Sequence, residues 1–196
     1  MFFIVLQYTI LESAAKIRMG FPMGYTLKKF ADDCHDILVE DCGIAGREKV
    51  RVLLCKVLVD PNFVSETFPD SNDLPRTVLY EDETLGFAIC SHVYKREAMS
   101  KPHDHGAHWA IYGQVAGQTE MFDYEFVDLP ENEDEPGTCR ATRNYRLMPG
   151  DAHLYNVGDL HAPRREGATK LIRIEGVNLD TIKRVYHKEI SSVAAE

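Results

Sequence analysis

The sequence predicts an all-β sandwich or barrel with a helical cover at its N-terminal end. Residues 26–59 carry apolar side chains at helical spacing. From residue 77 onward the chain breaks into short segments rich in β-branched and aromatic residues, which turn signals separate. Many short strands at regular intervals are typical of sandwiches and barrels.

Two helices are expected first. Thr26 is a suitable N-cap for a helix that ends near Gly43. Its apolar face is formed by residues at helical spacing: Leu27, Phe30, Cys34, Ile37 and Leu38. A second helix covers residues 46–59, and Pro61 is expected to stop it because proline lacks a backbone N–H.

The strand segments follow at regular intervals. They cover residues 77–80, 86–94, 109–115, 119–127, 138–147, 153–157 and 169–175. The acidic, proline-containing stretch 128–136 is expected to be a solvated loop between two of them. We interpret residues 23–196 as one domain whose helical cover lies at about 26–60, and residues 1–22 as a poorly informative extension.

Charge, cysteines and hydropathy restrict the functional class. Lys and Arg number 22 and Asp and Glu 31, and the net charge of −9 argues against a nucleic-acid or anionic-membrane binder. The five cysteines are odd in number and widely spaced, which suits free thiols in a reducing, cytoplasmic compartment. The apolar run 1–11 is shorter than the ~20 residues of a membrane span and lacks the basic region of a signal peptide.

Histidines carry the clearest chemical signal. His103 and His105 form an H-x-H pair, and on a strand residues two apart point to the same face, so both imidazoles can converge on one cation. The surrounding stretch, PHDHGAHWAIYGQVAGQTE, resembles the first motif of the cupins, which have an acidic ligand and then a glycine after the H-x-H pair. Gly117 is in register with that motif, whereas Ala110 stands in the acidic position.

A missing carboxylate with intact spacing resembles the thiol dioxygenases, a cupin branch that binds ferrous iron through three histidines. Their third ligand follows a turn that ends in Leu-His, which matches His161 in the stretch GDLH. His153 is the alternative, because Pro149-Gly150 loosely imitates the second cupin motif. The resemblance implies a cupin double-stranded β-helix, or jelly-roll barrel, that holds Fe(II), with Zn, Mn and Ni as alternative metals.

The same resemblance implies a substrate-binding arginine. Arg76 lies upstream of the histidines where the family holds the substrate carboxylate, and a guanidinium group suits a carboxylate because it donates two charge-assisted hydrogen bonds.

Two departures from the family make cysteine a doubtful substrate. Ala110 excludes the cysteine–tyrosine crosslink of some members, and residues 169–176 lack the family's Ser-x-His-x-Tyr signature.

Further candidates follow from strand parity and position. Tyr112 and Gln114 share parity with Ala110 and are expected to face the cavity, where the Tyr112 hydroxyl is a catalytic candidate. Arg164, Arg165 and Arg173 follow soon after His161, and one of them is a candidate to face the site, although solvated surface is the default for each. Of the three, Arg173 is the substrate-binding candidate. His35 and His187 are also expected at the surface.

These features favour a non-haem iron dioxygenase that oxidises a small anionic organic substrate, with dioxygen as its second substrate, as a monomer or homodimer. The alternatives are another metal-dependent cupin enzyme, such as a lyase, isomerase or hydrolase, and a non-catalytic metal-binding or ligand-binding cupin.

Overall fold

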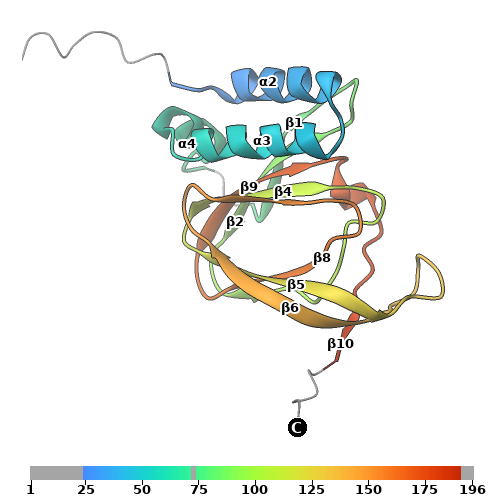
Figure 1. Cartoon of the computed structure of the whole chain (residues 1–196). Helices are drawn as coiled ribbons and strands as arrows, with labels where there is room; N and C mark the ends of the chain where they lie inside the picture. The colour runs from blue at the N-terminus through green and yellow to red at the C-terminus, as the bar shows by residue number, and fades with distance from the viewer. Residues whose placement is uncertain (1–23, 72–73, 191–196) are drawn as a thin grey trace, which may run out of the picture.

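The computed structural model describes residues 24–71 and 74–190, and the predicted extension 1–22 lies outside them. Helices cover one face of a β-sheet, and a second sheet closes the barrel on the opposite side (Figure 1). The strand orders are β1-β2-β9-β4-β7 and β10-β6-β5-β8-β3. The expected jelly-roll barrel with N-terminal helices is therefore confirmed.

Three described helices form the cover: α2 (Leu27–Glu40), α3 (Ile44–Val57) and α4 (Pro61–Thr67). The predicted cap is confirmed, because Thr26 Oγ1 accepts a hydrogen bond from the Lys29 N–H at 3.1 Å. Pro61 differs from the prediction. It begins α4 instead of merely stopping α3, since a proline at the first helical position loses no hydrogen bond and Asp60 caps the next N–H groups.

The ten strands of the described residues lie close to the segments expected from the sequence, with three additions. The first sheet contains β1 (Arg76–Glu81), β2 (Ala88–Tyr94), β4 (Ala110–Ala116), β7 (Ala152–Tyr155) and β9 (Thr169–Glu175). The second contains β3 (Ala98–Met99), β5 (Thr119–Asp128), β6 (Thr138–Leu147), β8 (Leu160–Arg165) and β10 (Lys188–Glu189). The sequence pattern does not predict β3, β8 or β10; β3 and β10 are only two residues long, and Pro163 interrupts the β-type pattern of β8.

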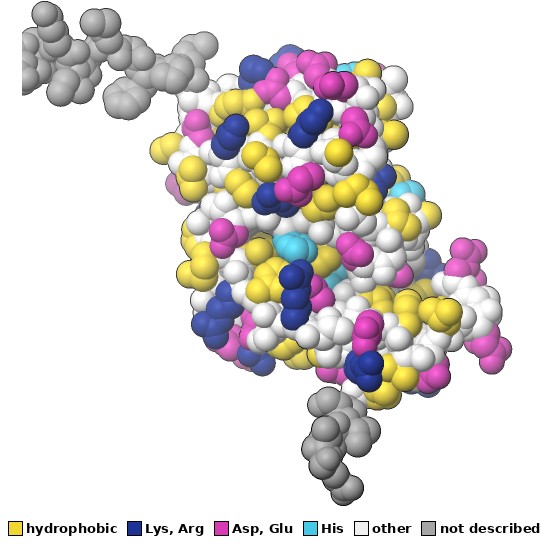
Figure 2. Space-filling view, viewed as in Figure 1, with side chains coloured by type: hydrophobic (Ala, Val, Ile, Leu, Met, Phe, Trp, Pro, Cys, Tyr) yellow, Lys and Arg dark blue, Asp and Glu magenta, His cyan; other side chains and the backbone are white. Residues whose placement is uncertain are grey.

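The outer face of the first sheet and the helices share one hydrophobic core. Phe30, Leu54 and Phe63 from the helices pack with Ile111 and Ile172 from the sheet, and all five are fully buried. Gly113 permits this close contact, because a Cβ atom there would lie 2.7 Å from a methyl group of Leu54. On the solvent side, acidic, basic and apolar side chains are interspersed over the helical layer (Figure 2).

Residues 176–190, which we call the C-terminal segment, lie against the loop that carries the H-x-H pair. After β9 the chain forms a short 3-10 helix, Leu179–Thr181, and then runs along the 100–105 loop. Tyr186 forms a β-bridge with His103, and the His187 N–H donates to the Pro102 carbonyl at 2.8 Å. This segment therefore lies directly against the residues of the predicted H-x-H pair.

Two other sequence expectations concern the whole chain. All five cysteines lie in the described ranges as free thiols, with Cys34, Cys90 and Cys139 buried. No helix in residues 24–71 or 74–190 has the length and apolar character needed to cross a membrane.

Candidate metal centre

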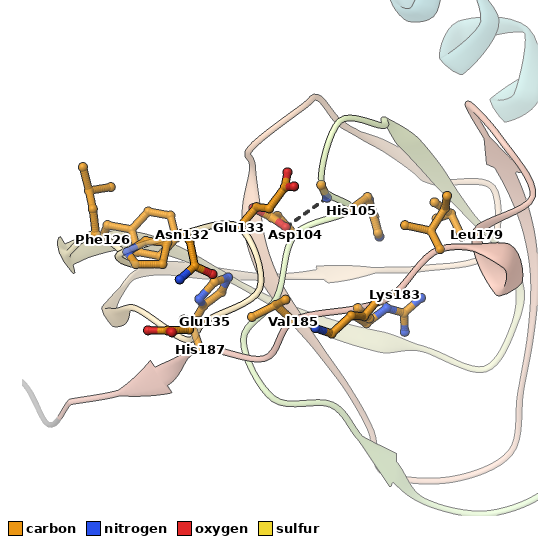
Figure 3. A pocket seen from close by; sticks show the side chains of 15 residues that line it. Asp104, His105, Phe126, Asn132, Glu133, Glu135, Leu179, Lys183, Val185 and His187 are labelled. Atoms are coloured by element: carbon orange, nitrogen blue, oxygen red, sulfur yellow. Dashed lines mark hydrogen bonds between the residues drawn. The ribbon is translucent and has the colours of Figure 1, made fainter.

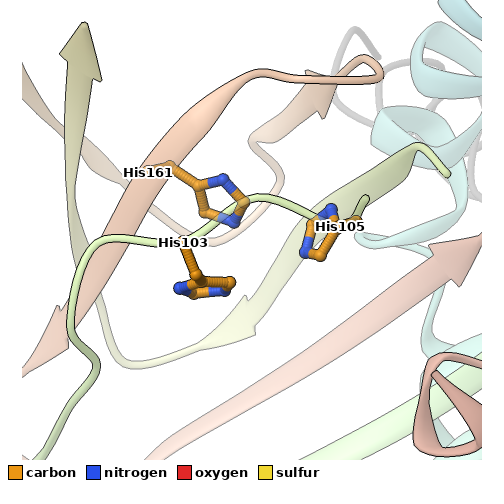
Figure 4. A group of neighbouring side chains, drawn as sticks. All are labelled: His103, His105 and His161. Carbon is orange, nitrogen blue, oxygen red and sulfur yellow. The ribbon is translucent and has the colours of Figure 1, made fainter. Parts of the chain in front are cut away.

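Three histidines converge inside the barrel. The potential ligand atoms of His103, His105 and His161 lie within 4.8 Å of one another, and each side chain is at most 4% exposed (Figure 4). His161 belongs to β8, whereas His103 and His105 lie in the loop between β3 and β4 rather than on the expected strand. An antiparallel bridge holds the two segments together, because the backbones of His103 and His161 exchange hydrogen bonds of 3.0 and 2.9 Å.

Backbone carbonyls orient two of the rings. His103 Nδ1 lies 2.9 Å from the Lys101 carbonyl, and His161 Nδ1 lies 3.0 Å from the Asp159 carbonyl. Because a carbonyl only accepts, each Nδ1 carries the proton and each Nε2 has a free lone pair. The buried His103 Nε2 and His105 Nδ1 atoms have no hydrogen-bond partner among the described residues. Buried imidazole nitrogens without a hydrogen-bond partner, in a cluster of three histidines, fit a bound cation.

Burial keeps these imidazoles neutral. It lowers the pKa of His103 to about 3 and places the pKa of His105 and His161 well below the usual value for histidine, and the neighbouring histidines and arginines add to the effect. Neutral imidazole is the metal-binding form. Within the described ranges the cluster includes no carboxylate, which agrees with Ala110 in the acidic position. The donor set suits a divalent transition metal, and several such ions satisfy it.

Tyr112 lies at the centre of the cluster, as strand parity predicts. Its hydroxyl oxygen is 3.3 Å from His105 Nε2 and 3.3 Å from His161 Nε2. Burial raises the pKa of the Tyr112 phenol, so the hydroxyl keeps its proton. Tyr155 supports the site from behind, because its ring stacks on His161 with centroids 3.8 Å apart.

His153, the alternative third ligand, is not part of the cluster. It lies on β7, where its ring contacts Tyr145 and Tyr155 at centroid distances of 4.9 and 4.7 Å. The geometry therefore favours His161 as the third nitrogen donor, and His153 packs in an aromatic group beside it.

Arg173 is the substrate-binding candidate that the structure places beside the histidines. Its guanidinium carbon lies 4.5 Å from the centroid of the Tyr112 ring, and the side chain is 7% exposed. Arg173 Nη2 is 3.3 Å from Glu175 Oε1, while its Nε and Nη2 atoms have no hydrogen-bond partner among the described residues. Arg173 can therefore still donate hydrogen bonds to a ligand.

Arg76 is the residue expected to bind the substrate carboxylate. Its guanidinium group is already paired within the protein, with Glu175 at 2.8 Å, Asp180 at 2.6 Å and the Asn178 side chain at 2.8 Å. Arg76 also does not line either cavity beside the histidines. A guanidinium that already holds two carboxylates of its own chain does not support the expected carboxylate clamp, and the role of Arg76 in substrate binding stays a prediction.

Gln114 requires a correction. Its side chain faces inward as expected, but its amide donates to the Ala116 carbonyl at 2.7 Å and accepts from Thr119 Oγ1 at 2.9 Å. Both bonds fasten the hairpin between β4 and β5, and Gln114 is fully buried away from either cavity. Gln114 is therefore a structural residue rather than a substrate ligand.

Two cavities flank the histidines. The first, of about 410 Å³, is lined by His103, Tyr112 and Arg173 among others, and we call it the basic cavity. The second, of about 370 Å³, is lined by His105, the 129–135 loop and the C-terminal segment, and we call it the acidic cavity. In Figure 3, Glu133 and Glu135 lie on one side of the acidic cavity and Lys183 on the other. The loop expected to be merely solvated thus forms a cavity wall.

Three cavity residues were not among the predicted site residues. Arg165 is 4% exposed and lines the basic cavity. It has the same strand parity as His161, and this pattern identifies Arg165 once β8 is recognised as a strand. Arg184 lines both cavities and has no sequence signal. His187, expected at the surface, is 6% exposed and lines the acidic cavity, because its ring packs on Phe126.

No family model and no curated protein sequence matches this chain. Solved structures are similar in fold. KdgF from Halomonas sp. is 22% identical over 51% of this chain and 74% of its own, with a TM-score of 0.38. A cupin superfamily protein from Desulfitobacterium hafniense is 14% identical over 53% of this chain and 76% of its own, with a TM-score of 0.37.

A protein with a double-stranded β-helix domain from Klebsiella pneumoniae is 16% identical over 64% of this chain and 88% of its own, with a TM-score of 0.42. At such identities the similarity concerns the fold alone, and the thiol dioxygenase branch stays a prediction.

Proposed function

We propose that this protein is a non-haem iron dioxygenase that oxidises a small anionic organic molecule. The observation that supports the proposal most is the buried cluster of three neutral histidines, without a carboxylate, beside a phenol and an arginine-lined cavity. Three neutral ligands leave the charge of a dipositive ion uncompensated, which favours an anionic substrate over a neutral one.

His103, His105 and His161 would hold the metal. Ferrous iron bound there would supply redox chemistry toward dioxygen, and three protein ligands leave coordination positions open for substrates. A dioxygenase places both oxygen atoms in its product, so the reaction requires no external reductant. The sequence correspondingly contains no Gly-rich motif for binding a redox cofactor.

The protein's own residues have separate tasks in this proposal. Arg173 binds an anionic group of the substrate through its free N–H groups, and the Tyr112 ring beneath it holds the guanidinium in place. The Tyr112 hydroxyl, at 3.3 Å from two imidazole nitrogens, donates a hydrogen bond to the reacting group. Tyr186 and the rest of the C-terminal segment exclude bulk water from His103.

The test combines metal analysis with oxygen consumption. The full chain is purified without added metal, analysed for bound metal, and then loaded in separate samples with Fe(II), Mn, Ni or Zn. Thiols, diketones and phenolic acids are screened with an oxygen electrode. We expect oxygen uptake with the iron-loaded protein alone, its loss in His161→Ala, and its retention in the control His153→Ala, whose ring lies outside the cluster.

Other outcomes would contradict the dioxygenase. Turnover of a substrate without oxygen uptake, in the presence of Zn, Mn or Ni, would indicate a metal-dependent lyase, isomerase or hydrolase. A protein that retains metal and a small ligand but turns over nothing with any of the four ions would indicate a binding protein.

A further inference from the structure

The wall of the basic cavity has an unusual charge for this protein. Four of its lining residues are Lys101, Arg165, Arg173 and Arg184, and neither aspartate nor glutamate lines it. The whole chain carries a net charge of −9. A positive cavity in a negative protein is a local feature that concentrates anions at this point of the surface.

Arg165 is the most buried of these cations. It is 4% exposed, its Nε atom has no hydrogen-bond partner, and no carboxylate in the described ranges forms an ion pair with it. Its guanidinium carbon lies over the Tyr94 ring at 4.1 Å, and Tyr94 in turn stacks on His92. Burial lowers the pKa of Arg165, and the nearby charge of Arg173 lowers it further. A buried cation without a counter-ion costs free energy unless a ligand neutralises it.

Arg173 repeats this arrangement on the neighbouring wall. Its guanidinium lies over Tyr112 at 4.5 Å, and it shares Glu175 with Arg76. Both buried arginines therefore rest on aromatic faces, which hold the planar groups while leaving N–H edges free.

The charge balance indicates how many negative charges are missing. Arg76 pairs with Glu175 and Asp180, and Arg173 pairs with Glu175. Within the described ranges no ion pair joins Arg165 or Arg184 to a carboxylate, so two guanidinium charges on the cavity wall have no carboxylate partner there. A ligand with a single negative charge would leave one of these two cations uncompensated, and the burial of Arg165 makes that costly.

We propose that the basic cavity selects small organic dianions, with Arg165 and Arg173 as the two anion-binding residues and the bound molecule lying against His103. A dicarboxylate and a phosphate monoester share this chemistry. The cavity volume of about 410 Å³ suits a small molecule of this kind. This inference rests on the proposed function only in taking the bound dianion to be the substrate.

Anion binding can be measured without turnover. The full chain, both as purified and after chelation of metal, is titrated calorimetrically with succinate, glycerol phosphate and propionate at constant ionic strength. We expect succinate or glycerol phosphate to bind at least about 10-fold more tightly than propionate, because each charge-assisted contact contributes roughly that factor. Succinate and glycerol phosphate differ in anion geometry, so their ratio distinguishes a dicarboxylate site from a phosphate site.

The variant Arg165→Gln tests the assignment. It should abolish the preference for dianions while leaving the weak binding of propionate, and its melting temperature without ligand should not fall, because an uncompensated buried cation is removed. Arg165→Lys keeps the charge and should retain part of the preference. The control Arg146→Gln removes one positive charge from an exposed site on β6 and should behave as the wild type.

Two results would overturn the proposal. One is equal affinity of the wild type for succinate, glycerol phosphate and propionate. The other is an unchanged dianion preference in Arg165→Gln. These measurements need neither metal nor dioxygen, so they are independent of the dioxygenase test. A protein that binds dianions but consumes no oxygen would refute the dioxygenase and support the anion site. A protein that consumes oxygen but shows no preference for dianions would support the dioxygenase and refute the anion site.

Discussion

The two cavities beside the histidines differ most in charge. The basic cavity has arginines stacked on aromatic rings and no acidic lining residue. The acidic cavity is lined by Asp104, Glu133 and Glu135 together with Lys183 and Arg184, so its cations are balanced by carboxylates. Their volumes are similar, at about 410 and 370 Å³. Size therefore does not distinguish them, and charge determines which one an anionic molecule enters.

This difference divides the surroundings of the cluster into two sides. His103 and Tyr112 face the basic cavity, and His105 faces the acidic one. An anion bound on the basic side lies next to the Tyr112 hydroxyl, whereas on the acidic side it meets carboxylates. Substrate binding is thus expected on the basic side, and the following predictions test that assignment.

The largest effect is expected at the shared centre. His161→Ala should weaken metal binding by roughly 3–4 kcal/mol, the share of one ligand in a typical tetrahedral site. A metal ion bound by the cluster would be lost from between the two cavities in this variant, so substrate affinity should fall together with metal affinity. Metal affinity is measured by competition with a chelator. Loss of metal in His153→Ala, with retention in His161→Ala, would contradict the assignment, because the His153 ring lies with Tyr145 and Tyr155.

The variant Arg76→Ala tests whether Arg76 stabilises the fold or binds the substrate. Glu175 is fully buried and loses one of its partners in this variant, while the Leu179 N–H and Arg173 remain, so the free energy of unfolding should fall by about 2 kcal/mol. Urea unfolding measures this loss. Because Arg76 lines neither cavity, the preference for dianions should remain. Unchanged stability together with lost anion binding would support Arg76 as the carboxylate clamp.

Tyr112→Phe tests the catalytic side of the basic cavity. The variant keeps the ring beneath Arg173 but removes the hydroxyl, and turnover should fall about 100-fold with metal content unchanged. Steady-state kinetics and metal analysis give both values. Tyr155→Phe is the matched control, since its ring stays on His161 while the lost hydroxyl bonds only Tyr145. Equal losses in both variants would assign Tyr112 a packing role.

The sequence predicted best those features of the fold that local backbone geometry determines. Thr26 caps its helix through a bond to a residue three positions on, and the alternation of β4 places Tyr112 on the inner face. The H-x-H pair was found from its spacing and His161 through the resemblance to thiol dioxygenases, and the structure brings these residues together.

Residues whose environment depends on distant partners could not be predicted. Arg76 is engaged by Glu175, which is 99 positions away, and no local pattern reveals that bond. Arg184 lies in a segment without regular periodicity, whose path is determined by the bridge between Tyr186 and His103. Arg165 is a different case: the sequence offers Arg164, Arg165 and Arg173 together, and choosing Arg165 requires the register of β8, which the sequence pattern does not predict.

The smallest effect is expected on the acidic side. Glu133 is exposed at the acidic cavity, so Glu133→Gln removes a long-range repulsion without touching an anion in the basic cavity. Succinate affinity should rise by no more than about 2–3-fold at ~0.01 M salt and stay constant at ~0.15 M, where the Debye length is only about 8 Å.

Calorimetry at both salt concentrations checks this, with Glu131→Gln as the control, because Glu131 is exposed in the same loop and lines neither cavity. If Glu133→Gln improves succinate binding 10-fold or more, and if this gain persists at the higher salt concentration, the anion lies in direct contact with Glu133. The substrate would then bind in the acidic cavity, beside His105, instead of in the basic cavity.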